Sequence, residues 1–213
     1  MRAVVMRARG GPEVLEVADL PVPEPGPKEV RVRLKAAALN HLDVWVRKGV
    51  ASPKLPLPHV LGADGSGVVD AVGPGVEGFA PGDEVVINPG LSCGRCERCL
   101  AGEDNLCPRY QILGEHRHGT YAEYVVLPEA NLAPKPKSLS FEEAAAIPLT
   151  FLTAWQMVVD KLGVRPGDDV LVMAAGSGVS VAAIQIAKLF GARVIATAGS
   201  EDKLRRAKAP GAD

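Results

Sequence analysis

Four cysteines form the densest group of chemistry-bearing residues in this chain of 213 residues. They follow the spacing C-x2-C-x2-C-x7-C and are Cys93, Cys96, Cys99 and Cys107. Two-residue gaps let successive thiolates turn toward one point, and the longer loop brings the fourth sulfur round to close a tetrahedron, as Zn²⁺ with four sulfur ligands requires. Arg95 and Arg98 would offset part of the negative charge, and the absence of a water position predicts a structural zinc. The alternative is two disulfides, which suit a secreted protein.

A glycine-rich turn lies between a predicted strand and a predicted helix. Residues 174–180 read AAGSGVS. Small residues in this context let the backbone approach a pyrophosphate, and the helix N-terminus supplies N–H groups and partial positive charge. The turn therefore indicates a dinucleotide site, with a tight turn that binds no ligand as the alternative. The candidate cofactor-binding residues of the turn are Ala175, Gly176, Ser177, Gly178 and Val179.

The end of the next predicted strand indicates which dinucleotide would bind. NAD sites usually have Asp or Glu there, to hold the ribose hydroxyls. This chain has Ala198-Gly199-Ser200 instead, with Lys203, Arg205 and Arg206 shortly after. No carboxylate at the strand end repels a 2′-phosphate, and Ser200 and Lys203 are suited to hold one. The sequence therefore favours NADP(H) over NAD(H).

The elements that must position these residues change in character near residue 150. Before it, short alternating segments between Gly and Pro turns predict strands over 30–35, 65–72, 83–87 and 121–126. After it, the pattern predicts a helix over 151–161, a strand over 170–173, a helix over 179–190, a strand over 193–197 and a charged helix from Glu201. The fold class is therefore mixed α+β and α/β: a β-rich domain over 1–150 with a cysteine lobe at about 90–110, then a parallel crossover unit over 151–213.

The crossover unit is short for its class. An open doubly wound sheet usually has about six strands, whereas two such strands precede Asp213. We therefore expect a fragment of a longer protein. The alternative, a complete small domain with a two-strand appendage, would leave apolar faces uncovered.

Composition excludes several classes of function. With 47% hydrophobic, 23% charged and 4% aromatic residues and a net charge of -1, the chain has neither the basic stripe nor the stacking rings of a nucleic-acid surface. No apolar signal-peptide core follows Met1. The uncharged run between Asp169 and Lys188 is interrupted by the glycine-rich turn, which argues against a membrane span. We expect a cytoplasmic protein that acts on a small molecule.

Several segments resemble the medium-chain dehydrogenase/reductase superfamily. They are residues 1–17, the cysteine lobe, GPGVEGFAPGDEV at 73–85, GTYAEY at 119–124 and the turn at 174–180. The resemblance covers essentially the whole chain. It implies a GroES-like catalytic domain over 1–150 and an incomplete NAD(P)-binding Rossmann domain over 151–213. It also implies that the full-length protein is a homo-oligomer, either a dimer or a tetramer.

The chain departs from the zinc alcohol dehydrogenases of this superfamily at the catalytic zinc. The positions that match their three ligands by motif hold Asn40, Ala63 and Leu149, and Leu42 replaces the hydroxyl that starts the proton relay. The resemblance therefore implies a zinc-free active site. The quinone oxidoreductase branch shares the residues at 40, 43 and 47–49, but generally lacks the cysteine lobe.

This similarity implies hydride transfer from a nicotinamide to a quinone or conjugated carbonyl. Such electron-poor acceptors need less activation than an alcohol, whose oxygen a metal normally polarises. We name three candidate catalytic residues: Asn40 as donor to the oxygen that gains charge, Asp43 as a positioning group and Trp45 as an apolar wall. The alternatives are a turn role for Asn40, an ion pair with Arg47 for Asp43 and core packing for Trp45.

Two other functions stay open. A zinc-dependent alcohol dehydrogenase with atypical ligands would draw on the histidines, which are His41, His59, His116 and His118, with Asp43 and Asp64 as possible partners. Hydrogen-bonded or solvated histidines are the commoner outcome. A non-catalytic, zinc-stapled fragment is the other possibility: we expect the isolated chain to be inactive and its full-length parent to be an oxidoreductase, because the rest of the sheet should complete the nicotinamide pocket.

Overall fold

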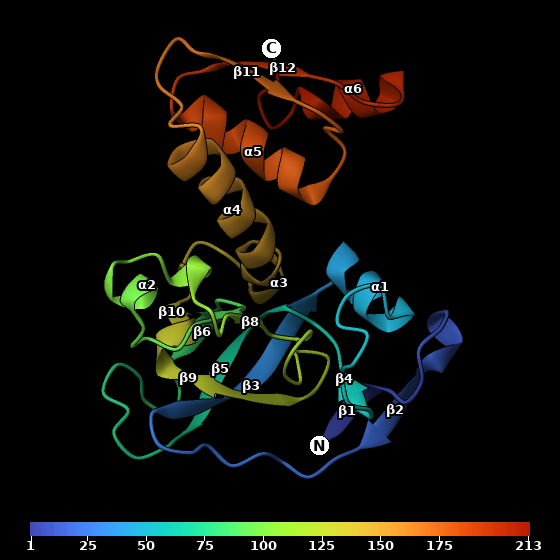
Figure 1. The fold of residues 1–213 in the computed structure, drawn as a ribbon, viewed down its shortest axis with the longest axis vertical. Helices are drawn as coiled ribbons and strands as arrows, with labels where there is room; N and C mark the ends of the chain where they lie inside the picture. The colour runs from blue at the N-terminus through green and yellow to red at the C-terminus, as the bar shows by residue number, and fades with distance from the viewer. The chain divides into compact units, whose positions relative to one another are not determined.

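All residues from 1 to 213 are described by the computed structural model, in which Met1–Pro148 and Leu149–Asp213 form two units (Figure 1). Each unit has a hydrophobic core of its own. The N-terminal unit contains strands β1 to β10, whereas the C-terminal unit alternates strand and helix. None of the helices combines the length and the apolar character that a membrane span requires.

A five-stranded antiparallel sheet forms the centre of the N-terminal unit. In spatial order its strands are β10 (Leu132–Pro134), β6 (Glu84–Ile87), β5 (Asp64–Val72), β3 (Glu29–Ala38) and β9 (Tyr124–Pro128). Val30 and Val32 of β3 are fully buried, while Arg31 between them points away from the core and pairs with Asp70 at 2.7 Å. The alternation that predicted this strand is therefore confirmed, because one face of the sheet packs on the core.

Shorter elements of the N-terminal unit surround this sheet. A second sheet consists of β1 (Arg2–Met6), β2 (Leu15–Asp19) and β4 (His59–Val60), with the 3-10 turn η1 (Pro12–Val14) before β2. The cysteine lobe contains β7 (Gly90–Leu91), α2 (Glu97–Leu100), η2 (Asp104–Leu106) and β8 (Gln111–Ile112). The remaining elements are α1 (His41–Lys48), η3 (Glu129–Asn131) and α3 (Phe141–Ala145). Of these, α1 follows β3 directly and carries the candidate catalytic residues.

The strand predicted over 121–126 is wrong at its start. Strand β9 begins at Tyr124. The residues before it bond to the loop after β4: the N–H groups of Gly119, Thr120 and Tyr121 donate to the carbonyls of Val60, Gly62 and Leu61 at 2.8–3.0 Å. Within 121–123, the carbonyl of Tyr121 accepts from the N–H of Val4 at 2.7 Å and the N–H of Glu123 donates to the carbonyl of Arg2 at 3.0 Å, so these residues bond to β1 and do not extend β9.

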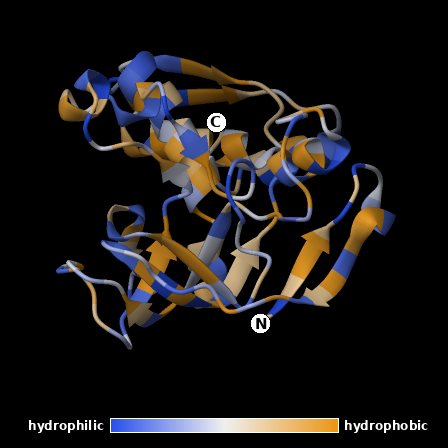
Figure 2. Cartoon of the chain, turned by 60° about the horizontal axis from the view of Figure 1, so that its bottom comes forward, coloured by the Kyte–Doolittle hydropathy of each residue, from blue (hydrophilic) through white to orange (hydrophobic).

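The C-terminal unit is a strand-helix-strand crossover, as predicted. Strands β11 (Asp169–Val172) and β12 (Arg193–Ala196) pair in parallel, and helices α5 (Gly178–Leu189) and α6 (Glu201–Ala207) follow them in turn. Val170 and Val194 of the strands share a buried core with Ile184 of α5. Figure 2 shows both strands mainly in hydrophobic colours. This composition is typical of parallel strands, which are usually covered on both faces.

The helix predicted over 151–161 changes its winding in the middle. Residues Pro148–Trp155 form the α-helix α4, and Gln156–Lys161 continue as the π-helical segment η4. The N–H of Leu162 accordingly donates to the carbonyl of Met157, five residues back, at 3.0 Å.

Candidate active site and metal centre

The start of helix α1 is fixed by one buried carboxylate. Asp43 accepts hydrogen bonds from the backbone N–H of Asn40 at 2.7 Å, from the backbone N–H of Gly62 at 3.1 Å and from the hydroxyl of Tyr121 at 2.8 Å. Burial raises the pKa of Tyr121, and the Asp43 carboxylate raises it further, so the hydroxyl stays protonated and donates. Asp43 thus joins three segments that are distant in sequence, and its positioning role in a reaction stays a prediction.

The ion pair between Asp43 and Arg47 that helical spacing allows is not formed. All three partners of Asp43 are donors from outside the Arg47 side chain. The Nε atom of Arg47 is buried and has no hydrogen-bond partner. Sequence reasoning missed Tyr121 and Gly62, and no local signal could have found them, because Tyr121 is 78 residues from Asp43.

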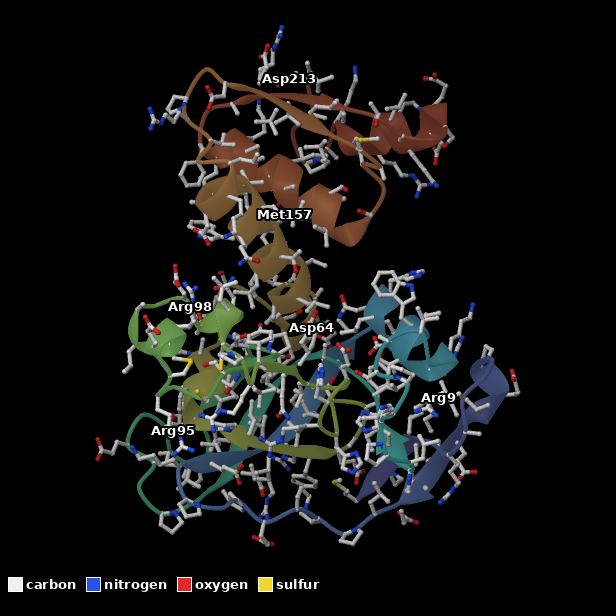
Figure 3. All side chains as sticks on the ribbon, in the orientation of Figure 1. Arg9, Asp64, Arg95, Arg98, Met157 and Asp213 are labelled. Carbon is white, nitrogen blue, oxygen red and sulfur yellow. The ribbon has the colours of Figure 1, made fainter.

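Asn40 is held by a second carboxylate. Its Nδ2 atom donates to Oδ2 of Asp64 at 2.9 Å. Asp64 is fully buried at the first position of β5, and Figure 3 labels it within the N-terminal unit. Asn40 is also the N-cap of α1, as the turn alternative supposed, while its role as a donor to a substrate stays a prediction.

Trp45 and His41 lie on the outer surface of α1. The Trp45 residue is 47% exposed, and its ring meets the ring of His41 edge to face at 4.9 Å between centroids. Core packing is therefore the wrong interpretation of Trp45. An apolar wall is compatible with this exposure and stays a prediction.

The other three histidines bond to backbone groups. Nε2 of His59 lies 3.0 Å from the carbonyl oxygen of Gly114, His118 Nδ1 accepts from the N–H of Val60 at 3.2 Å, and His116 Nδ1 accepts from the N–H of Ile112 at 3.1 Å. Burial lowers the pKa of His59 to about 4 and also lowers that of His118. These contacts favour the hydrogen-bonded interpretation of the histidines over that of metal ligands.

The low pKa of His59 predicts a loss of stability in acid. The unfolded side chain binds a proton near pH 6.5 and the folded one near pH 4, so between these values the unfolded state holds more protons. The free energy of unfolding should therefore fall by about 3 kcal/mol as the pH drops through this window. Urea unfolding at pH 7.0 and pH 4.5 measures the fall.

His59→Gln is the matched variant for this experiment. Glutamine keeps an N–H for the Gly114 carbonyl but does not titrate, so the variant should lose most of the pH dependence. Taking the difference between the two proteins removes the contributions of other acid-sensitive groups. Equal pH dependence in both proteins would refute the assignment to His59.

The four cysteines come together as predicted. Their sulfur atoms all lie within 4.8 Å of one another, with Sγ to Sγ distances of 3.4 Å for Cys96–Cys99, 3.8 Å for Cys96–Cys107 and 3.9 Å for Cys93–Cys99. Four sulfurs around a zinc at about 2.3 Å would be about 3.8 Å apart, so the cluster fits this ion. All four cysteines are free thiols, which disfavours the disulfide interpretation.

The charge around the cluster is arranged differently from the prediction. The Arg98 side chain is exposed and pairs with Glu103, and Figure 3 shows it beside the yellow sulfur atoms. The backbone N–H of Arg95 lowers the pKa of Cys93 to about 5, and the Arg109 side chain also bonds to this sulfur. Arg109, two residues after the last cysteine, was missed; its place beside Cys107 is the signal that could have found it.

The glycine-rich turn in the C-terminal unit has the geometry of a strand-to-helix turn. Ser177 caps α5, its hydroxyl accepting from the N–H of Ser180 at 3.2 Å. A Cβ at Gly178 would lie 3.0 Å from Cγ2 of Thr150, so a larger residue would crowd the approach of α4 and α5. The first N–H groups of α5 point out of the helix end, as a pyrophosphate site needs.

Several side chains after β12 that we expected to face a dinucleotide already have partners within the protein. Ser200 caps α6 and accepts from the N–H of Lys203 at 3.4 Å, while Arg205 and Arg206 both pair with Asp202. The aliphatic part of Lys203 lies 3.4 Å from where a Cβ of Gly176 would be. Lys203 is therefore the cation that approaches the glycine-rich turn.

Comparisons with known proteins agree with this fold. Residues 26–137 match the family of alcohol dehydrogenase GroES-like domains. The chain is 40% identical to a zinc-type alcohol dehydrogenase-like protein of Schizosaccharomyces pombe and 32% identical to human quinone oxidoreductase, covering 100% and 95% of this chain and 60% and 54% of theirs. A solved structure of an NAD-dependent alcohol dehydrogenase is 99% identical with a TM-score of 0.98, covering all of this chain and 62% of that one.

The fold and the matches define an architecture of a GroES-like domain followed by a partial Rossmann-type domain. The chain belongs to the alcohol dehydrogenase GroES-like domain family, within the medium-chain dehydrogenase/reductase superfamily. It spans about 60% of the length of the relatives it matches. The superfamily and the mixed fold class predicted from sequence are therefore confirmed.

Proposed function

We propose that this chain is part of an oxidoreductase that transfers hydride between a nicotinamide dinucleotide and a quinone or conjugated carbonyl. The observation that carries the proposal is the environment of Asn40, where the family's first zinc ligand would stand. Its amide is anchored by Asp64 and its backbone by Asp43, so a neutral hydrogen-bond donor occupies the place of a metal ligand. Alcohol oxidation is the second candidate, favoured by the name of the 99% identical relative.

In the proposed reaction, Asn40 and Trp45 would bind and orient the substrate, with Asp43 as a positioning group. A bound reduced nicotinamide would supply the hydride. The Asn40 amide would donate to the acceptor oxygen as it gains negative charge, and a fixed donor of this kind typically contributes about 10²-fold in rate. Trp45 would bound the substrate on its apolar side. Asp43 would keep Asn40 in place without touching the substrate.

We propose one structural zinc in the cysteine lobe. Cys93, Cys96, Cys99 and Cys107 would supply all four ligands and leave no position for water or substrate. The zinc would stabilise this lobe, in which only Cys107 of the four cysteines is buried. The name of the yeast relative, a zinc-type dehydrogenase, supports this metal.

For the dinucleotide we propose the turn at 175–179 together with Ser200 and Lys203. The sequence preference for NADP(H) was based on the missing carboxylate at the strand end and on small donors with nearby cations, but two of these cations, Arg205 and Arg206, are paired with Asp202. The 99% identical relative is named as NAD-dependent. We therefore propose that NAD(H) binds at least as well as NADP(H), with Lys203 as the one cation near the turn.

The experiment uses a completed protein, meaning this chain joined to the part of the 99% identical dehydrogenase that it does not cover. NADH and NADPH are assayed with quinones, enones and alcohols. We expect reduction of quinones or enones to exceed alcohol oxidation. Alcohol oxidation as the dominant activity would refute the proposed substrate class. Failure to bind either dinucleotide would refute the proposal that the protein is an oxidoreductase.

Asn40→Ala tests the proposed donor. The kcat/KM for the accepted substrate should fall about 10²-fold, because the acceptor oxygen loses its hydrogen bond. The lost helix cap costs about 1 kcal/mol of stability. Ser140→Ala is the matched control, since it removes the cap of α3, where the Ser140 hydroxyl accepts from Glu143 N–H at 3.1 Å. Unchanged turnover by Asn40→Ala would remove the assignment.

A further inference from the structure

Asp64 is the buried acid that anchors the Asn40 amide. It is fully buried, and its side chain accepts from Nδ2 of Asn40 at 2.9 Å. Its backbone carbonyl accepts from the hydroxyl of Thr120 at 2.7 Å. In the register of β3 and β5 it pairs with Ala38, two residues before Asn40, so the bond joins the ends of adjacent strands.

The chemistry of the pair fixes the direction of the Asn40 amide. An ionised carboxylate only accepts hydrogen bonds, whereas an amide has a donating and an accepting end. In the structure the Asn40 nitrogen, and not its oxygen, faces Asp64 and donates to its carboxyl oxygen. One of the two hydrogens on Nδ2 is used in this bond, and the other is available in a direction that the bond sets.

The backbone that carries Asp64 is itself tightly held. A Cβ at Gly119 would lie 2.0 Å from the carbonyl oxygen of Gly62, and Gly62 has a positive φ of 101°. The N–H of Thr120 donates to the same carbonyl at 2.9 Å. Because side chains would not fit at this crossing, the segment before β5 packs closely against residues 119–120, which supports the position of the Asp64 carboxylate.

We propose that Asp64 is a positioning residue that orients the Asn40 amide, so that the second N–H of Nδ2 is presented to the substrate oxygen. The inference depends on the donor role of Asn40 in the proposed function. It assigns Asp64 no contact with the substrate. Without Asp64 the amide can turn over and present its carbonyl, which would repel an oxygen that gains negative charge.

The test is a double-mutant cycle of Asp64→Asn and Asn40→Ala in the completed protein, with the best quinone or enone as substrate. Asp64→Asn should lower kcat about 10- to 100-fold with little change in KM, because orientation matters most in the transition state. In the Asn40→Ala background the same substitution should have almost no further effect. A purely structural role would lower activity in both backgrounds, and that result overturns the proposal.

A second readout needs no activity. In the 213-residue chain labelled with ¹⁵N, the Asn40 side-chain proton that faces Asp64 should exchange slowly with water. Asp64→Asn should speed this exchange and shift the Asn40 amide signals, while Asp202→Asn on the surface should change neither. Unchanged Asn40 signals in Asp64→Asn overturn the proposal.

These outcomes separate the two hypotheses. If the completed wild-type protein reduces no quinone or enone, the proposed function fails and the role of Asp64 falls with it. If the wild type is active and Asp64→Asn has the same kcat, only the proposed role of Asp64 is refuted. Should Asp64→Asn not fold, Asp64→Glu carries the same cycle, because it keeps the acceptor but displaces it by one methylene.

Discussion

Replacing Cys99 with serine is expected to abolish zinc binding and open the cysteine lobe. Cys99 lies 3.4 Å from the sulfur of Cys96 and 3.9 Å from that of Cys93, so its loss leaves three ligands and a gap in the tetrahedron. Structural zinc in small domains has an apparent binding free energy of about 10–16 kcal/mol, and because the site forms only on folding, this free energy also stabilises the fold. The zinc content measured after dialysis should fall from one per chain to near zero, and protease should cut within residues 93–107.

Arg98→Ser is the matched control for Cys99→Ser. It changes a residue between the ligands, but its exposed side chain pairs only with Glu103. It should keep the zinc and the resistance to protease, with a reducing agent present throughout. A Cys99→Ser protein that is as resistant as the wild type, or a wild type that binds no zinc, would refute the structural role of the metal.

Asp43→Ala should cost at least about 3 kcal/mol of unfolding free energy. The substitution leaves three donors without their acceptor: the N–H groups of Asn40 and Gly62 and the hydroxyl of Tyr121. A buried donor left unpaired costs about 1–3 kcal/mol. Urea unfolding of the 213-residue chain at pH 7 measures the loss.

Two further variants check the cause of that loss. Tyr121→Phe removes one donor and leaves the carboxylate with its two backbone partners, so it should cost about 1 kcal/mol. Asp202→Ala removes a carboxylate from surface pairs with Arg205 and Arg206 and should change stability by about 0.5 kcal/mol or less. If Asp43→Ala lowered the free energy of unfolding as little as Asp202→Ala, that result would contradict the role of Asp43 in joining the three segments.

The sequence predicted best those features that are local in the chain. The cysteine cluster is one, because its four ligands lie within a single loop and their spacing alone brings them together. The strand-helix-strand unit is another, since the periodicity of 170–197 and the stop at Gly191 lie within one crossover. The structure shifts these elements by only one residue, with β11 at Asp169–Val172 and α5 at Gly178–Leu189.

The partners within the candidate active site were beyond sequence reasoning. Asp43 meets Tyr121 across 78 residues, and Asn40 meets Asp64 across 24. Such contacts depend on strand register and on how a loop crosses the sheet, which no local pattern encodes. Helical spacing suggested Arg47 as the partner of Asp43 instead, because within a helix the spacing points only to neighbours three or four residues apart.

The most direct test measures the number of zinc ions per chain in the completed protein and reads their ligands by X-ray absorption. It distinguishes a structural zinc in the cysteine lobe from a zinc in the reaction pocket, which we propose contains no metal. We expect one zinc per chain with four sulfur ligands at about 2.3 Å. A second zinc, or one bound through nitrogen or oxygen at the start of α1, would contradict it.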